Sequence, residues 1–358
     1  MIDDEVLPAH ARGCAILGTG GGGAPKIGLL AARQAIADHG PVPLVDLDDL
    51  PDDEMVMPIG MLGAPTVSIE KISNGDEGVW LRDAVEKTTG RKVAAVMPSE
   101  IGGSNGCSPI AWAAKLGLPL VDGDGMGRAF PEMPQVAMEV AGVDPSPCLM
   151  VDERRNTLVT WPTDGAWLER ICRANAVAFG GRAVSSEYLM TVAQARHSVV
   201  RGSVTLAMEI GRALEDAVGD PVDSLLDKVR GFRLIEGKIT DVDRRTTGGF
   251  VRGSVIVEGL RGDSGRLLRL ELQNENLIAL EDGQLRACVP DLITVLDTQT
   301  ADAIPTELLR YGQRVTVIAF GCDPVWRTER GLALTGPRAF DYDLDYVPVE
   351  ELHREAVR

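Results

Sequence analysis

The chain has 358 residues, of which 44% are hydrophobic and 25% charged, a balance typical of a globular protein long enough for two domains. Its 36 basic and 53 acidic side chains give a formal net charge of −17, which argues against nucleic acid as a partner because a phosphate backbone repels such a surface. No apolar stretch reaches the roughly 18 residues of a membrane span, and the acidic N-terminus is unlike a signal peptide. The 6 cysteines form no CxxC pair, so we expect reduced thiols in a cytoplasmic protein. Charge and hydropathy together lead us to expect neither a membrane nor a nucleic acid as partner.

The first half of the chain alternates helical and strand patterns. Apolar residues at helical spacing predict helices, and short apolar runs bounded by Pro and Asp predict buried strands. The predicted helices lie at 7–17, 26–37, 74–87 and 108–116, and the predicted strands at 42–45, 55–59, 92–97 and 119–122. This alternation is typical of a mainly parallel sheet covered by helices, so we assign residues 1–165 to an α/β domain.

The pattern changes beyond about residue 232. Runs rich in β-branched residues follow one another with Gly and Asp turns between them, which predicts an antiparallel β region. The predicted strands lie at 233–243, 249–258, 266–273, 277–280 and 314–320, and two helices at 164–179 and 203–218 precede them. We therefore expect a helix-linked, β-rich C-terminal domain over residues 166–358.

Five glycines among residues 18–23 lie between the first two predicted helices. Backbone N–H groups of such loops can hold anions at helix N-termini, which makes Gly20, Gly21 and Gly22 candidate donors to a ligand. The run has no Walker-type lysine and follows a helix rather than a strand, so neither common nucleotide-binding fingerprint applies. The alternative is a flexible turn between helices, although five glycines exceed what a turn needs.

Residues 98–106 contain Glu100 and Asn105 at the point where a predicted strand ends and a helix follows. Ligands of open α/β sheets bind outside the carboxyl ends of the strands, so both side chains are candidates for a binding site. A polar loop in which Ser104 or Asn105 caps the helix is an equally good interpretation.

Residues 121–135 contain several charged side chains within one short segment. Asp122 and Asp124 flank a glycine directly after a predicted strand, and Arg128 and Glu132 follow. Carboxylates and a guanidinium in one loop could bind a cation, hold a planar substrate or transfer protons, whereas a turn closed by a surface Asp–Arg pair is the alternative. We favour a functional site, because such a loop is costly unless it makes one.

Two later segments are polar without a strong signal of function. Asn274 and Glu275 interrupt an apolar strand pair, for which a hairpin turn is the plain explanation, and Asp291 lies at the entry of a predicted strand. The four histidines show no metal-binding spacing, and there is no G-x-S-x-G elbow. From the residues alone we predict an enzyme-like acidic site whose reaction is unspecified.

Several motifs follow one another in the order found in one known protein family. They are G-T-G-G-G at 18–22, D-G-D at 122–124, G-R-A-F-P-E at 127–132, Q-N-E-N at 273–276, P-D-L-I at 290–293, Y-G at 311–312, W-R-T at 326–328 and G-P-R-A-F at 336–340. Through them nearly the whole chain resembles the S-methyl thiohydantoin desulfurase-like family, long described as a domain of unknown function and as hydantoinase/oxoprolinase-associated. One departure is Asp341, where members usually carry glycine.

The resemblance implies an α/β N-terminal domain to about residue 165, a β-rich C-terminal domain, and a hydrolase of hydantoin-like or S-methyl-thiohydantoin-like rings. Water would attack C2 of the five-membered ring and release a thiol, with Asp124 or Glu132 as base. Arg128 would orient ring oxygens or a substrate carboxylate, and the Gly20–Gly22 amides would donate to developing charge. The expected catalytic set is Asp122, Asp124, Arg128 and Glu132. The expected substrate-binding set is Gly20, Gly21, Gly22, Glu100, Asn105, Asn274, Glu275 and Asp291.

Three alternatives stay open at this point. A divalent metal held by Asp122, Asp124 and Glu132 would also activate water. The chain could instead be a non-catalytic accessory subunit that docks to a hydantoinase or oxoprolinase, or a nucleotide-binding regulator, which the missing lysine disfavours. The expected partners are a small ring substrate and either further copies of the chain, since a sheet edge needs covering, or a hydantoinase-type protein.

Overall fold

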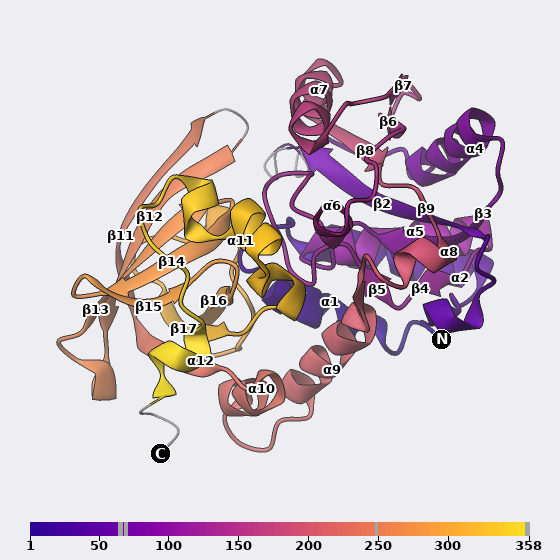
Figure 1. Ribbon diagram of the computed structural model, residues 1–358. Helices are drawn as coiled ribbons and strands as arrows, with labels where there is room; N and C mark the ends of the chain where they lie inside the picture. Colours follow the sequence, from indigo (N-terminus) through magenta and orange to yellow (C-terminus); the bar gives the residue numbers. More distant parts are fainter. Residues whose placement is uncertain (64–66, 68–70, 248–249, 355–358) are drawn as a thin grey trace.

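The computed structural model describes residues 1–354 except 64–66, 68–70 and 248–249, and its strands form two large sheets (Figure 1). The first sheet is mixed, with the strand order β1-β4-β3-β2-β8-β6-β7, and β9 pairs with β2 beside this path. Its strands are β1 (Leu44–Val45), β2 (Met55–Gly63), β3 (Val93–Pro98), β4 (Leu120–Val121), β6 (Cys148–Val151), β7 (Thr157–Thr160), β8 (Arg182–Ser186) and β9 (Met190–Thr191). The pairs β1–β4, β4–β3 and β3–β2 are parallel, which confirms the expected mainly parallel core of the α/β half.

Most helices precede the second sheet in the chain. They are α1 (Leu7–Leu17), α2 (Pro25–His39), α4 (Glu77–Thr89), α5 (Ser104–Leu116), α6 (Ala137–Ala141), α7 (Gly165–Ala178), α8 (Val192–Ala195), α9 (Ser203–Glu215) and α10 (Pro221–Val229), and α11 (Glu329–Thr335) and α12 (Val349–Leu352) lie in the second half. Single 3₁₀ turns are η1 (Leu47–Asp49), η2 (Arg261–Asp263), η3 (Thr306–Leu308), η4 (Pro324–Arg327) and η5 (Pro337–Phe340). No helix of the described residues is long and apolar enough to cross a bilayer.

Alternating residues of the central strands enter two different cores. In β2, Met55 and Met57 pack in the core formed with α1, α2 and α5, whereas Val56 packs in the core that contains Phe130. A sheet buried on both faces needs apolar side chains on both, which is why the central strands read as continuous apolar runs.

The second sheet is antiparallel and contains seven strands in the order β15-β14-β13-β12-β11-β17-β16. They are β11 (Phe232–Thr247), β12 (Phe250–Gly259), β13 (Leu267–Gln273), β14 (Glu275–Glu281), β15 (Gln284–Cys288), β16 (Leu292–Asp297) and β17 (Arg314–Phe320). The β-rich half predicted beyond about residue 232 is confirmed. Gly249, the predicted start of one strand, lies outside the described residues.

Two features depart from the local patterns. Helix α5 begins at Ser104, four residues before the predicted start, so residues 104–106 are not loop. Because of this earlier start, Pro109 lies inside the helix rather than in its first turn, where proline is favoured. Strand β8, beyond residue 165, pairs with β2 in the middle of the first sheet, so the chain returns to that sheet before it enters the second at β11.

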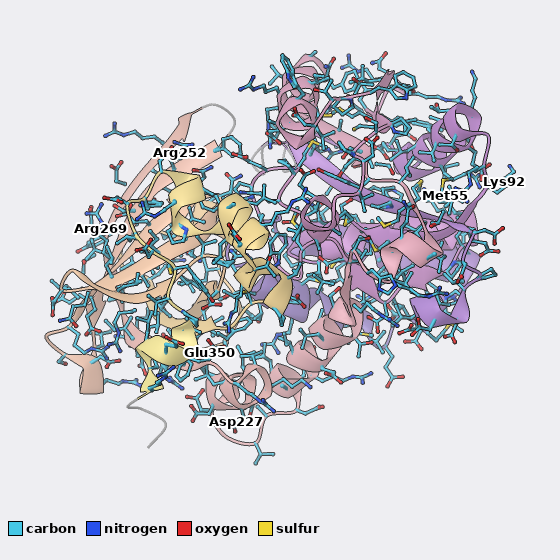
Figure 2. The ribbon with its side chains drawn as sticks, viewed as in Figure 1. Met55, Lys92, Asp227, Arg252, Arg269 and Glu350 are labelled. Atoms are coloured by element: carbon cyan, nitrogen blue, oxygen red, sulfur yellow. The ribbon has the colours of Figure 1, made fainter. Side chains whose placement is uncertain are left out.

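The exterior is charged, as the labelled side chains illustrate. Lys92, Asp227, Arg252, Arg269 and Glu350 are all exposed (Figure 2). Solvent hydrates such groups at little cost, so they carry no information about a site. Buried charged groups are the informative ones, and several lie where the two halves meet.

Candidate active site

A cavity of about 420 Å³ opens where the two halves meet. Its walls come from one face each of α2 and α5, from the ends of β2 and β3, from β8, and from the turn before β14. This volume is in the range of small-molecule sites. Four buried glutamates line it. Glu77 accepts from the N–H groups of Asn74 and Gly75, whereas Glu100, Glu187 and Glu275 each keep one carboxyl oxygen without a hydrogen-bond partner among the described residues.

Glu100 follows β3 and is only 6% exposed. Asn105 Nδ2 donates to Glu100 Oε2 at 2.5 Å, and Asn105 Oδ1 accepts from Met61 N at 2.9 Å, so the amide fixes the carboxyl against β2. Burial raises the pKa of Glu100 to about 8, with a further rise from the Asp124 charge and an opposing effect of the Asn105 hydrogen bond. Its Oε1 has no hydrogen-bond partner among the described residues. Glu100 is therefore a protonated carboxyl group at neutral pH with one oxygen available to a ligand.

Glu187 directly follows β8, on the other side of β2 from Glu100. It is 5% exposed, and its Oε2 has no partner in the described part of the chain. Burial raises the pKa of Glu187 to about 7, although the Ser185 hydroxyl opposes this. The cavity therefore holds two carboxyl groups whose pKa values lie near neutrality.

Glu275 brings a third carboxyl group from the β-rich half. It is 2% exposed, and burial together with the charge of Glu100 raises its pKa well above the usual value. A Cβ atom on Gly21 would lie 2.0 Å from Glu275 Oε1, so only glycine at position 21 leaves room for this carboxyl. The turn between β13 and β14 is the expected hairpin, and it also delivers Glu275 to the cavity.

The glycine run packs backbone to backbone against the start of α5. A Cβ on Gly22 would lie 2.3 Å from Gly102 O, and one on Gly103 would lie 2.4 Å from Gly23 O. Gly20, Gly22, Gly23 and Gly103 all have positive φ. Close approach, rather than flexibility, therefore explains the glycines.

The same glycine loop also makes hydrogen bonds to the β-rich half, and we call this contact the seam between the two halves. Asn276 N donates to Thr19 O at 2.9 Å, and Thr306 N donates to Gly20 O at 2.9 Å. Gly22 and Gly23 line the cavity, and within the described part of the chain their N–H groups donate no hydrogen bond. These two amides are available to a ligand.

Arg182 in β8 adds a cation to the cavity wall. It is 6% exposed, and its guanidinium Nη2 donates to Ser73 Oγ at 2.5 Å. It forms no ion pair with any described carboxylate, although buried guanidinium groups are normally paired. The apolar part of the lining includes Met126, Phe130 and Met133.

The two aspartates of the predicted catalytic set do not line the cavity. Asp122 accepts from Thr205 N at 2.9 Å and from Thr205 Oγ1 at 2.5 Å, close to the start of α9. Asp124 is fully buried and accepts from the N–H groups of Ile101, Met126 and Gly127. Burial raises the pKa of Asp124 to about 6. Asp124 therefore ties the start of the loop after residue 124 to the segment after β3, and Asp122 ties the same segment of chain to α9.

Arg128 and Asp291 also lie away from the cavity lining. Arg128 is fully buried and donates to Thr19 Oγ1, Ala129 O, Pro290 O and Asp291 O, so it joins the two halves. The Asp291 carboxylate accepts from four donors in the β-rich half, which are Cys322 N, Arg327 Nη2, Tyr346 Oη and Val349 N. Hydrogen bonds within the protein thus already engage both groups.

The remaining predicted residues divide clearly. Those that line the cavity are Gly22, Glu100, Asn105, Glu132, Asn274 and Glu275. Gly20 and Gly21 lie just behind it in the seam. Glu132 is partly buried, and burial and the charge of Glu169 raise its pKa. Asp122, Asp124 and Glu132 do not form a group of metal-ligand geometry among the described residues.

Sequence reasoning missed Glu187 and Arg182. Both lie in the segment 182–187, which enters the cavity because β8 inserts beside β2. The polar triplet Ser185, Ser186 and Glu187 at the end of an apolar strand was the available signal. Asp341, where the resemblance led us to expect glycine, has a φ of 66°, a left-handed backbone conformation that glycine adopts without strain.

The comparisons with known proteins cover both halves. Residues 5–161 match the model of the S-Me-THD-like N-terminal domain, and residues 163–349 match that of the S-Me-THD-like C-terminal domain. The crystal structure of a protein from Chromobacterium violaceum superposes with a TM-score of 0.81 at 24% sequence identity, covering 97% of this chain and 99% of that chain, and shows the same fold. A comparison with curated proteins finds no match.

Proposed function

Because the chain belongs to the S-Me-THD-like family, we propose that it hydrolyses a five-membered hydantoin-like or S-methyl-thiohydantoin-like ring in the cavity between its two halves. The observation that carries this proposal is the pair of buried carboxyl groups, Glu100 and Glu187, in one cavity of small-molecule size. Their pKa values of about 8 and about 7 suit proton transfer at neutral pH.

The reaction needs two proton transfers. Water adds to C2 of an S-methyl-thiohydantoin ring and loses a proton to a base, which forms a tetrahedral intermediate. The bond between C2 and sulfur then breaks and an acid delivers a proton to the sulfur, which leaves as methanethiol. The proton of the added hydroxyl group moves to the ring nitrogen through solvent, which gives the hydantoin, and the proton taken up by the base returns to the acid. An acid and a base that differ in pKa can divide these tasks between them.

Glu187 fits the base and Glu100 the acid. With a pKa of about 7, Glu187 is substantially ionised at neutral pH and can accept a proton from water. Glu100, with a pKa of about 8, keeps its proton and can donate it to the departing sulfur. Glu132, the one member of the predicted catalytic set on the cavity wall, is the alternative base.

The rest of the cavity fits the ring. The N–H groups of Gly22 and Gly23 and the Arg182 guanidinium supply donors for ring oxygens and for negative charge that develops during water attack. Met126, Phe130 and Met133 offer an apolar surface for the methylthio group. Asp122, Asp124 and Arg128 would then act as positioning residues, since their hydrogen bonds hold the loops and the two halves in place.

The competing function is a non-catalytic subunit that docks to a hydantoinase or oxoprolinase. A docking module has no need of ionisable groups in a cavity, and burying three carboxyl groups there is costly unless they are used. The buried glutamates therefore favour the enzyme.

A substrate screen tests the proposal. The purified chain is incubated with hydantoin, 2-thiohydantoin and S-methyl-thiohydantoin rings, with thiol release followed in a colorimetric assay and ring opening followed by chromatography. We expect turnover of at least one ring. If no ring is turned over and the chain binds a purified hydantoinase, the enzyme proposal is wrong and the non-catalytic docking subunit is the better interpretation.

A further inference from the structure

Three side chains that zinc prefers meet between α1 and α5, outside the cavity. His10 and Cys14 lie one turn apart on α1, and Cys107 faces them from α5. Their candidate ligand atoms all lie within 4.8 Å of one another, and Cys14 Sγ is 3.2 Å from His10 Nε2. Tetrahedral zinc places its nitrogen and sulfur ligands at about 2.0–2.3 Å, so one ion can bridge atoms at these separations.

The cluster is more polar than its surroundings require. His10 and Cys14 are fully buried and Cys107 is 1% exposed. His10 Nδ1 has no hydrogen-bond partner among the described residues, and Nε2 lies 3.0 Å from Gly106 O. An imidazole buried with an unsatisfied nitrogen costs stability, whereas an aliphatic residue would pack there without that cost. The position is therefore unusual for a purely structural histidine.

The charges in this place also suit a divalent ion. A neutral imidazole carries a lone pair on one ring nitrogen, and Nε2, which lies 3.2 Å from Cys14 Sγ, is the nitrogen placed to offer it to an ion. No carboxylate belongs to the cluster, which disfavours magnesium and calcium. Two thiolates, one neutral imidazole and Zn²⁺ sum to zero charge, and a dry interior tolerates such a neutral group.

We propose that His10, Cys14 and Cys107 bind one zinc ion, with the carbonyl oxygen of Gly106 as the nearest further oxygen donor. Binding displaces the two thiol protons to solvent and forms two zinc–sulfur bonds and one zinc–nitrogen bond. The proposal is independent of the hydrolase activity, because none of the three side chains lines the cavity.

Such an ion would stabilise the two loops that lie beside the cavity. The backbone carbonyl of Cys14 accepts from Gly18 N at 2.9 Å and from Gly103 N at 2.7 Å. These two glycines belong to the two glycine-containing loops that meet beside the cavity. Tying Cys14 to Cys107 would fix both loops at their origin. Zinc binding should therefore raise the melting temperature of the whole chain.

The test is the zinc content of the full chain purified under reducing conditions and equilibrated with Zn²⁺. We expect one zinc per chain, and zinc binding weakened at least about 100-fold in Cys14→Ser and Cys107→Ser, since even changes beside a ligand cost 10- to 100-fold. Cys172→Ser is the matched control: Cys148 Sγ and Cys172 Sγ form another buried thiol pair, 3.4 Å apart, without a histidine in a metal-ligand group. This variant should keep its zinc.

A second measurement needs no variant. Co²⁺ added to the metal-free chain should produce the near-ultraviolet charge-transfer absorption of cobalt–thiolate bonds and should be displaced by Zn²⁺. Absence of zinc together with absence of this absorption overturns the proposal. So does zinc that binds equally well to the wild type and to Cys14→Ser and Cys107→Ser.

Discussion

Glu100 and Glu187, like Glu275, are buried, form no ion pair among the described residues and line the same cavity, unlike most acidic residues of this acidic chain. Neither forms an ion pair with a described cation, so desolvation dominates their pKa values. Carboxyl groups of this kind are costly to keep and are characteristic of sites that move protons.

Arg182 gives a prediction about substrate binding. Replacing Arg182 by Met keeps an unbranched side chain and removes the donors that face the cavity. A hydrogen bond to a charged group is worth about 1.5–3 kcal/mol, so we expect kcat/KM to fall about 10- to 100-fold, through a higher KM from lost contacts to ring oxygens and a lower kcat from lost stabilisation of the developing charge. Steady-state kinetics measure this. Arg170→Met, which alters an exposed arginine on α7, is the control and should leave KM unchanged.

Asp122 gives the opposite prediction. Its carboxylate binds Thr205 at the start of α9, so Asp122→Asn should cost about 1 kcal/mol of stability, as the loss of a helix cap does, and leave kcat nearly unchanged. Thermal melting and kinetics on the same preparation decide it. A variant that melts like the wild type but has lost its turnover would return Asp122 to the catalytic set.

At the scale of the elements, two glycine loops set the shape of the cavity. Gly103 and Gly117 flank α5 with φ of 61° and 64°, but only Gly103 meets the backbone of another loop. Gly117→Ala should therefore cost about 1 kcal/mol for its positive φ alone. Gly103→Ala should cost about 2 kcal/mol more, because its Cβ collides with Gly23 O. Urea unfolding of both variants tests this; equal losses would mean that the two loops do not depend on close packing.

Most elements followed from local pattern, and the site only in part. Helix α1 begins and ends where periodicity predicts, because its apolar residues and the glycines after it are local signals. Glu100 and Asn105 were named as candidates because they follow a predicted strand, whereas Glu275 entered the expected binding set only through the family resemblance, since its own position predicted a hairpin turn; all three line the cavity. Glu187 was missed because its place depends on β8 pairing with β2, more than 100 residues away in the chain, and strand order is not encoded locally.

At the scale of the whole molecule, the raised pKa values make stability depend on pH. The folded chain holds protons on Glu100, Glu187 and Asp124 up to about pH 8, 7 and 6, whereas the unfolded chain releases them near pH 4. The folded state therefore binds more protons than the unfolded state in this window, so the free energy of unfolding falls as pH rises.

Between pH 6.5 and 8.5 we expect the free energy of unfolding to decrease, by on the order of 2 kcal/mol from Glu100 alone. The lower limit is the ordinary pKa of histidine, below which His10 and His353, whose pKa values are lowered, act in the opposite sense. Chemical unfolding across this range measures the slope. Glu100→Gln, which carries no proton to lose, should make the slope markedly shallower and leave the part due to Glu187; a wild-type slope of zero would mean that Glu100 is ionised in the folded chain.

The most direct test of the central claim is the rate of thiol release by Glu100→Gln, measured with a turned-over ring at pH 7 beside the wild type. Glutamine keeps the size of the side chain and can keep a contact with Asn105, but it cannot give a proton to the leaving sulfur. General acid catalysis contributes about 100-fold or more, so kcat should fall by at least that factor in a variant that melts cooperatively. Turnover at the wild-type rate would contradict the account and remove Glu100 from the chemistry.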